Sequence, residues 1–421
     1  MGVALTILMI LLVAAIAVPM LTFIVECLAA LLPVRRNAVA SMPDARPRVA
    51  VLVPAHNEEA GLATTLASIS EQLVEGDRLV VVADNCDDGT ADVARGFEGV
   101  EVVERVDEER RGKGYALGAG MDALRGDPPA VVVIIDADCT LQPDALQRLA
   151  ATAAAADAPT QCVYLLETPE DAGVLDQLSA FAFLVKNLVR QRGMMNLGQP
   201  ALLQGTGMAF PWMTIDTAQL NTGHIVEDLV IGLNMLEAGH APRFCMEAKV
   251  TSPQAAKKAA LTQRTRWEHG YLSTMFKRCP KLIAKGLLGR PHLLAVGLDL
   301  AVPPLSLLVV LYVIATGMIA AKALASGVFG PLIAMVVLGV AFAAVTLTVC
   351  LVFARGVIGV GTLLLAPAYA AWKIPIYFRF LVKPETTWVR TQRDDEPEPN
   401  HDDADPAAQP RNTKALSGTP S

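Results

Sequence analysis

Long uncharged stretches lie near both ends of the chain. In the region between these stretches, short apolar runs alternate with segments of helical periodicity. Residues 3–25 carry no charge and are about numerous enough to cross a bilayer as one helix. This stretch lacks the basic flank and the short apolar core of a cleaved signal peptide, so we interpret it as an anchor. Three further apolar blocks follow, at 293–321, 328–354 and 357–382. The pattern predicts a central folded region attached to a membrane at both ends.

Two of the C-terminal blocks contain residues that interrupt helices in lipid. Asp299 and the pair Pro303-Pro304 lie near the start of the first block, which predicts a kink there. Three residues break the last block: Pro367, Lys373 and Pro375. We therefore expect the last block to be a re-entrant or interfacial segment rather than a full crossing.

Basic residues flank the apolar blocks on the side of the central region. Arg35 and Arg36 follow the first block, and only Lys322 lies between the second and the third. Five basic residues precede the second block: Lys277, Arg278, Lys281, Lys285 and Arg290. By the positive-inside rule we expect a multi-pass protein of the cell's inner (plasma) membrane with its central region in the cytoplasm.

Between about residue 48 and residue 250, runs of strand length alternate with helical patterns. Strands are predicted at 49–53, 79–83, 100–103 and 130–135. Helices are predicted at 62–73, from Thr90 and at 115–124. This alternation predicts an α/β domain with a parallel sheet covered on both faces, whose ligand lies at the carboxyl ends of the strands. Glu58, Asp84 and Asp136-Ala137-Asp138 fall at those ends.

Composition narrows the range of partners. With 53% hydrophobic and only 18% charged residues, the chain is more apolar than a purely soluble protein. Its net charge of −7 argues against a nucleic-acid partner. Seven cysteines without a CxxC pair predict neither a disulfide framework nor a zinc site. The tail from Asp394 is rich in Pro, Asp and small residues, so we expect disorder there.

Two basic amphipathic stretches are expected to lie on the cytoplasmic membrane surface, with ordinary surface helices as the alternative. The stretch 175–192 combines an apolar face with Lys186, Arg190 and Arg192. The stretch 255–274 mixes basic residues with aromatic ones. It includes Gln263, Arg264, Arg266, Trp267 and Tyr271.

The polar residues at the strand ends suggest particular chemistry. Two carboxylates one residue apart, Asp136 and Asp138, can hold Mg²⁺ or Mn²⁺ together with substrate phosphates, the alternative being a solvated turn. Asp84 can accept a hydrogen bond from a nucleotide base, whereas 87–90 has the composition of a turn. The loop 110–114 suits a diphosphate but is not a Walker loop, because no Ser or Thr follows Lys113.

Two motifs further along the chain have both a structural and a chemical interpretation. Glu227 and Asp228 begin a predicted helix, where they either complement its dipole or supply a buried general base. Arg266 and Trp267 either clamp phosphate and stack on a sugar ring or anchor a helix at the bilayer surface. Position alone leaves both choices open.

In this order the motifs resemble those of the inverting family-two glycosyltransferases with the type A fold, a Rossmann-like, mostly parallel α/β fold. More narrowly, they resemble the membrane-integrated branch of cellulose, chitin and hyaluronan synthases. The resemblance runs from about residue 49 to residue 270. Its motifs are Pro54-Ala55-His56-Asn57-Glu58, Asp84, Lys113, Asp136-Ala137-Asp138, Gly205-Thr206-Gly207, Glu227-Asp228 and Gln263-x-x-Arg266-Trp267.

The resemblance implies a role for each motif. The donor would be bound by Pro54, His56, Glu58, Asp84, Lys113, Asp136, Gln263, Arg266 and Trp267. The acceptor would lie against Gly205, Thr206, Gly207 and Trp267. Asp138 would hold Mg²⁺ or Mn²⁺. Asp228, beside Glu227, would deprotonate an acceptor hydroxyl that displaces the diphosphate and inverts the anomeric carbon.

The implied function is hexose transfer from a nucleotide-diphosphate donor, expected to be UDP-linked, to a membrane-associated glycan or lipid-linked acceptor in extracellular polysaccharide synthesis. The chain has fewer apolar blocks than the large synthases, so a processive synthase is only narrowly favoured over transfer of a single sugar to a lipid carrier or glycolipid. A processive synthase would need self-association or partner export proteins.

Two interpretations lie outside this enzyme class. A transport subunit would carry ionisable residues deep in its spans, but Asp299 lies near an end. A non-catalytic scaffold would be expected to have lost its carboxylates, which are all present.

The sequence predicts five regions. They are an anchor at 1–34, a transferase domain at 47–250, interfacial helices at 251–290, membrane or re-entrant helices at 291–383, and a disordered tail at 394–421.

Overall fold

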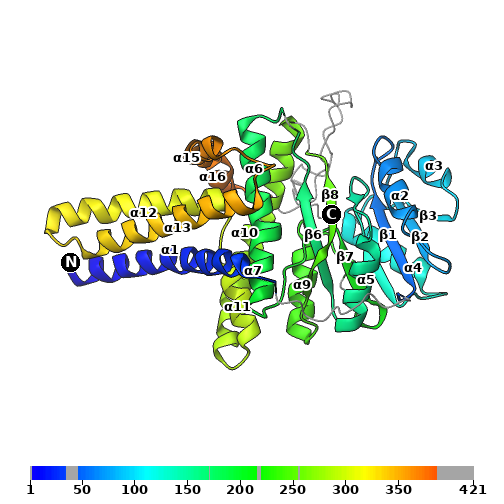
Figure 1. The fold of residues 1–421 in the computed structure, drawn as a ribbon, viewed down its shortest axis with the longest axis horizontal. Coiled ribbons are helices and arrows are strands. Elements are labelled where there is room, and N and C mark those ends of the chain that lie inside the picture. The colour runs from blue at the N-terminus through cyan, green and yellow to red at the C-terminus, as the bar shows by residue number, and fades with distance from the viewer. Residues whose placement is uncertain (1, 35–45, 170, 216–219, 255–256, 386–421) are drawn as a thin grey trace, which may run out of the picture.

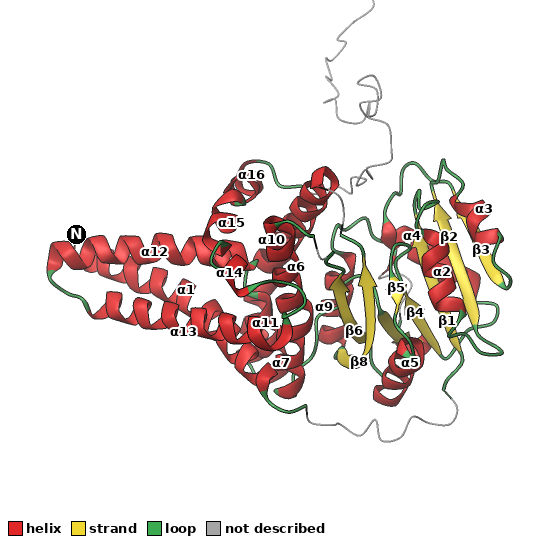
Figure 2. Cartoon of the chain, turned by 45° about the horizontal axis from the view of Figure 1, so that its top comes forward, coloured by secondary structure: helices red, strands yellow, loops and turns green. Residues whose placement is uncertain are grey.

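The computed structural model describes residues 2–34, 46–169, 171–215, 220–254 and 257–385, so the predicted disordered tail lies outside the described residues. An α/β domain occupies one end of the molecule, and three long helices project together from the other (Figure 1). The long helices are α1 (Gly2–Leu31), α12 (Leu305–Ser326) and α13 (Gly330–Phe353). Shorter helices stand between these two parts (Figure 2).

The domain is built on one eight-stranded sheet in the order β3-β2-β1-β4-β7-β6-β8-β5. Of the seven strand pairings among the described residues, four are parallel, as expected for a mostly parallel sheet. The strands are β1 (Val49–Ala55), β2 (Arg78–Asp84), β3 (Val100–Arg105), β4 (Val131–Ile134), β5 (Thr140–Leu141), β6 (Thr160–Leu166), β7 (Met208–Pro211) and β8 (Arg243–Ser252). The four strands predicted from the sequence are confirmed.

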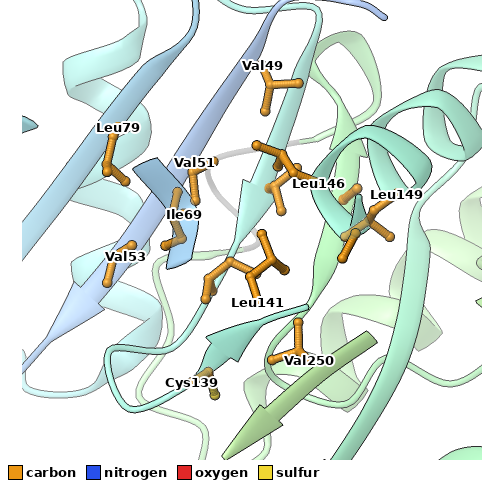
Figure 3. Close-up of a cluster of buried hydrophobic side chains, with 14 of the residues drawn as sticks. Val49, Val51, Val53, Ile69, Leu79, Cys139, Leu141, Leu146, Leu149 and Val250 are labelled. Atoms are coloured by element: carbon orange, nitrogen blue, oxygen red, sulfur yellow. The ribbon is translucent and has the colours of Figure 1, made fainter. Parts of the chain in front are cut away.

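Both faces of the sheet are buried, because successive side chains of a strand point to opposite faces and both sets are apolar. Val49, Val51 and Val53 of β1 pack with Ile69 and Leu146 in one core (Figure 3). The helices on that face are α2 (Leu62–Ser70), α3 (Thr90–Arg95) and α5 (Ala145–Ala156). The alternate residues of the strands form a second core with α4 (Lys113–Leu124) and α9 (Glu227–Ala238).

The three projecting helices are each long and apolar enough to cross a membrane. They pack side by side through a filled core that includes Met20 and Phe23 of α1, Ile319 of α12 and Val349 of α13. Many large apolar side chains on the outside of this bundle are exposed, among them Val313, Ile333 and Val340. Such an exposed apolar surface fits contact with lipid.

The interruptions in the C-terminal apolar blocks are helix boundaries. At Pro303-Pro304 the first block divides into α11 (Pro291–Leu300) and α12. The last block forms three short helices, none of them long enough to cross a bilayer. They are α14 (Val360–Leu363), α15 (Ala366–Trp372) and α16 (Ile374–Val382).

The predicted surface helix at 175–192 is α6 (Val174–Leu184), followed by the π-helical turn η1 (Val185–Arg190) and α7 (Gln191–Asn196). The prediction that Arg190 lies on the membrane surface is wrong, because this side chain is buried. Its Nε donates to Glu26 Oε2 at 2.6 Å, and it is also paired with the Asp299 carboxylate. A buried guanidinium needs anionic partners, and these come from α1 and α11, which no local pattern could reveal.

Candidate active site

A cavity of about 760 Å³ opens at the carboxyl ends of β1, β2 and β4 and continues to the long apolar helices α1 and α12. At one end its wall includes Glu58 and Asp84, and at the other Phe23 of α1 and Leu305 of α12. Helix α10 (Lys257–Leu287) lies along its side. One cavity therefore connects the polar strand ends with the apolar bundle.

Most of the predicted site residues line this cavity. They are Pro54, His56, Glu58, Asp84, Lys113, Asp136, Asp138, Gly205, Glu227, Asp228, Gln263, Arg266 and Trp267. Thr206 and Gly207 lie behind the wall instead. Thr206 is fully buried, and its Oγ1 accepts a hydrogen bond from Asp136 N at 3.0 Å. Thr206 therefore supports the carboxylate motif rather than facing the cavity.

Turns after β1 and β2 position the end of the cavity that Glu58 and Asp84 line. Asn57 adopts φ 54°, and its Oδ1 accepts a hydrogen bond from Asp87 N at 2.9 Å. His56 Nδ1 lies 2.7 Å from the carbonyl oxygen of Asp84. The Asp84 carboxylate pairs with Arg105 at 2.6 Å. No sequence motif pointed to Arg105, which lies at the end of the neighbouring strand β3.

Lys113 is the centre of an acidic cluster. Its Nζ donates to the carbonyl oxygen of Gly205 at 2.6 Å, contacts the Asp136 carboxylate and lies 3.9 Å from Glu227 Oε1. Burial opposes the charged form of Lys113, but the nearby carboxylates outweigh this effect and raise its pKa. One ammonium therefore compensates carboxylates from two places, the loop after β4 and the start of α9.

The acidic residues of the cluster hold their protons more tightly than in water. Burial raises the pKa of Glu227 to about 7, although Lys113 opposes the shift. Burial also raises the pKa of Asp136 and of Asp228, again against Lys113. A carboxylate whose pKa is raised toward neutrality is a stronger base than a free one.

Gly205 keeps space open beside the acidic cluster. A Cβ at this position would lie 3.6 Å from Asp228 Oδ2 and 3.8 Å from Lys113 Nζ, and the backbone φ is +94°. Any longer side chain would fill the gap between the carboxylate and the ammonium. The position therefore needs glycine both for its backbone conformation and for access to Asp228.

Asp136, Asp138 and Cys139 form a group whose potential ligand atoms lie within 4.8 Å of one another. Burial raises the pKa of the Cys139 thiol well above its usual value, and a soft sulfur is a poor ligand for hard cations such as Mg²⁺. The two carboxylates are the hard oxygen donors that Mg²⁺ and Mn²⁺ prefer. The residues present fit such an ion, with Asp138 as the ligand that Lys113 does not contact.

Helix α10 carries the motif Gln263-x-x-Arg266-Trp267, whose named residues line one side of the cavity. Burial lowers the pKa of Arg266, an effect that Glu227 and Asp136 oppose. The Trp267 ring lies 6.0 Å from that of Phe183, which makes an edge contact with Tyr164 at 5.0 Å. These aromatic rings all line the cavity and offer faces on which a sugar can stack.

Contacts with the C-terminal helices hold α10 in this position. Lys373 is paired with Glu268, which follows the motif directly, and His269 Nε2 lies 2.9 Å from the carbonyl oxygen of Ile376. Arg264 pairs with Asp176 of α6 at 3.3 Å. The segment after α13 therefore braces the motif on α10.

Several cavity residues were missed at the sequence level. They are Lys186, Asn187 and Gln204. Gln204 directly precedes the predicted acceptor motif, which could have drawn attention to it. Lys186 and Asn187 lie on the stretch interpreted as a surface helix, and only the fold shows that they face the cavity.

Comparison with known proteins relates the site to a family. A profile of the family described as Glycosyltransferase like family 2 matches residues 47–270, more than half of the 421-residue chain. The chain is 36% identical over 101 residues to Probable glycosyltransferase YdaM of Bacillus subtilis, covering 22% of this chain and 23% of that one. It is 29% identical over 107 residues to the undecaprenyl-phosphate 4-deoxy-4-formamido-L-arabinose transferase of Aeromonas hydrophila, covering 24% of this chain and 32% of that one. Each match therefore spans less than a third of the relative.

Among solved structures, the fold is similar to that of the mannosyltransferase PcManGT from Pyrobaculum calidifontis in complex with GDP-Man and Mn²⁺. The TM-score is 0.56 at 21% identity, covering 90% of this chain and 99% of that one. At this identity the similarity shows a shared type A fold.

Proposed function

The chain belongs to the Glycosyltransferase like family 2, and from this premise we propose that it transfers a hexose, with inversion, from a nucleotide-diphosphate donor to a lipid-linked acceptor. One observation carries the proposal. A single cavity joins the carboxylates at the strand ends, which suit a nucleotide sugar, to the apolar helices, which suit a lipid.

We assign the donor to the end of the cavity formed by β1, β2 and β4. Glu58 and Asp84 there offer acceptors for base and ribose, and Arg266 is the cation for the diphosphate. Asp136 and Asp138 would hold Mg²⁺ or Mn²⁺, which when bound supplies positive charge that stabilises the departing diphosphate. Mn²⁺ accompanies the donor in the similar mannosyltransferase structure, which supports this assignment.

The proposed general base is Asp228. Its carboxylate takes the proton of an acceptor hydroxyl while that oxygen bonds to the anomeric carbon from the face opposite the diphosphate. The bond from the anomeric carbon to the diphosphate oxygen breaks, and its electron pair leaves with the nucleotide. The raised pKa of Asp228, caused by burial, suits it to receive this proton. Lys113 and the neighbouring Glu227 set the charge around it.

We favour a single transfer to a lipid-linked acceptor over processive synthesis. Apolar side chains fill the core of the three-helix bundle, including Phe23 and Val349, a packing more suited to an anchor than to a polysaccharide channel. The name of the Aeromonas relative specifies a transferase that uses undecaprenyl phosphate, which also supports a lipid acceptor.

The full-length protein tests this function when it is incubated in detergent with radiolabelled UDP-hexoses or GDP-hexoses, Mg²⁺ or Mn²⁺, and a bacterial lipid extract. A UDP-sugar is the expected donor, and GDP-mannose is included because the similar structure contains it. We expect one labelled sugar per lipid in the organic phase. A ladder of longer products would support a processive synthase, and no transfer from any donor would contradict the proposal.

Asp228→Asn tests the base. This change should reduce transfer by about 10²–10⁴-fold, the range of general base catalysis, and leave donor binding intact. Asp138→Ala should instead weaken metal-dependent donor binding. Full activity in Asp228→Asn would contradict the assignment of the base.

A further inference from the structure

The π-helical turn η1 forms part of the cavity wall and presents two polar side chains there. Lys186 and Asn187 line the cavity together with the apolar or aromatic residues Phe23, Leu305 and Tyr369 of the surrounding helices. Turns of π-helix are rare and are frequently found at functional sites. This part of the wall lies outside the set of residues assigned above to the donor and the metal.

Lys186 is a cation without an anionic partner. Its side chain is exposed, although protein surrounds the cavity into which it projects. Within the part of the chain that the structure describes, it takes part in no hydrogen bond or ion pair, and its Nζ lies 5.4 Å over the ring of Tyr271. Burial lowers its pKa, which the nearby Asp228 opposes. The neighbouring Arg190, by contrast, is neutralised by Glu26 and Asp299.

Asn187 is an independent sign of a ligand. Its side chain is 1% exposed, and its Oδ1 has no hydrogen-bond partner among the described residues. A buried carbonyl oxygen without a donor costs free energy, so such groups normally have a partner. Because Asn187 lines the cavity, a donor that enters the cavity can supply the missing hydrogen bond.

We propose that Lys186 and Asn187 bind the headgroup of the acceptor, with a phosphate on Lys186 and a second hydroxyl, distinct from the one that reacts, donating to Asn187 Oδ1, while its apolar chains leave the cavity between α1, α12 and α15. This inference rests on the proposed function for the reaction and adds the chemical class of the acceptor: a lipid whose headgroup carries a phosphate and a free hydroxyl besides the reacting one.

Electrostatics favours this class over neutral lipids. An acceptor hydroxyl must approach Asp228, a site of negative charge that repels an anionic headgroup. The positive charge of Lys186 interacts with the Asp228 carboxylate, and Lys186 lines the cavity together with Phe23 of α1 and Leu305 of α12. It can therefore compensate the charge of an anionic headgroup. A neutral headgroup that entered the cavity would displace water from Lys186 without supplying a counter-charge, which is unfavourable.

The inference is tested by lipid binding to the full chain, independently of transfer. The protein is placed in phosphatidylcholine nanodiscs that contain either phosphatidylglycerol, with a phosphate and hydroxyls, or diacylglycerol, with a hydroxyl only. We expect the wild type to bind phosphatidylglycerol at least about tenfold more tightly, a difference of about 1.4 kcal/mol. Lys186→Met should abolish this preference and Lys186→Arg should retain it. Lys281→Met, at an exposed position of α10, is the matched control and should behave as the wild type.

Other outcomes overturn the inference. They are an unchanged preference in Lys186→Met, or equally tight binding of soluble glycerol phosphate, which would make the ligand a free phosphate ester. A parallel loss of nucleotide-sugar binding in Lys186→Met would assign Lys186 to the donor instead. If the wild type bound no nucleotide sugar but kept its lipid preference, the proposed function would fail and the headgroup site would stand.

Discussion

Lys113 is the residue on which the charge balance of the site depends. It contacts Asp136, lies 3.9 Å from Glu227 and donates to the backbone of Gly205. Removing one partner from a buried ion pair typically costs about 3–5 kcal/mol, because the other charge is left without compensation. The same carboxylates can escape this cost by taking up protons.

Lys113→Met should therefore lower the melting temperature of the detergent-solubilised protein, and the deficit should be larger at pH 8 than at pH 5.5. Burial raises the pKa of the carboxyl groups around position 113, so at the lower pH they take up protons more readily and depend less on a cation. Lys281→Met is the control for loss of a lysine at an exposed position. A deficit that does not change with pH would show that lost packing, rather than lost charge, is responsible.

The raised pKa values of Glu227 and Asp228 predict that stability and activity change with pH in opposite directions. Burial raises its pKa from 4.5 to about 7, so between these values the folded state binds more protons than the unfolded state. Stability should then fall as the pH rises from 4.5 to 7, by on the order of 3 kcal/mol. Activity should rise over the acidic range, because burial raises the pKa of the base Asp228, which must be ionised to act.

Thermal melts and initial rates from pH 5 to pH 8 measure both curves. Glu227→Gln should reduce the fall of the melting temperature with pH, because the substituted amide does not titrate, and the buried Asp136 and Asp228 should account for part of the remaining dependence. A melting temperature of the wild type that rises with pH across this window would contradict the prediction.

The cavity residues that the sequence predicted at strand ends share one property. Asp84, Asp136 and Asp138 follow strands of strongly β-branched sequence, and parallel topology brings such strand ends together. Lys186, Asn187 and the partners of Arg190 could not be found in this way. Their role depends on which side of a helix faces a cavity built from distant elements, and local periodicity contains no information on that.

At the scale of elements, long and regular patterns were predictable, and short ones were not. Strands β1 to β4 and helices α2, α3 and α4 appear where periodicity placed them. Strand β5 has only two residues, and β7 pairs antiparallel with β4 across a long insertion. Such short strands are stabilised by their partners rather than by their own sequence.

The contact between α7 and α1 provides a test at this scale. A Cβ on Gly193 would lie 2.0 Å from the backbone oxygen of Glu26, so the two helices touch through their backbones. Helix propensity alone would make Gly193→Ala stabilising by up to about 1 kcal/mol. The clash should outweigh this gain and destabilise the protein by about 1–3 kcal/mol, because α1 must move and disturb the Glu26–Arg190 pair.

The control is Gly126→Ala, since a Cβ at Gly126 meets no atom within 4 Å. Gly193→Ala should melt several degrees below Gly126→Ala in the same detergent. Equal melting temperatures would show that α1 can shift without cost.

At the scale of the whole molecule, the three long helices project from the domain in one direction, with the start of α1 and the α12–α13 connection at the same tip (Figure 1). If these helices cross the membrane, that tip and the domain lie on opposite sides. The basic residues that flank the apolar blocks favour the cytoplasm for the domain. The reactants then have distinct routes, with the nucleotide sugar entering from the cytoplasm and the acceptor from the bilayer.

Single cysteines should test this orientation. Val328, between α12 and α13, is 62% exposed, and Met213 on the domain is 90% exposed. In a Cys86→Ser background the other described cysteines are buried. A membrane-impermeant maleimide added to spheroplasts should therefore label Val328→Cys and not Met213→Cys, and permeabilisation should allow it to label both. Labelling of Met213→Cys in intact spheroplasts would place the domain outside the cell, where nucleotide sugars are absent, and would contradict the orientation on which the proposed reaction depends.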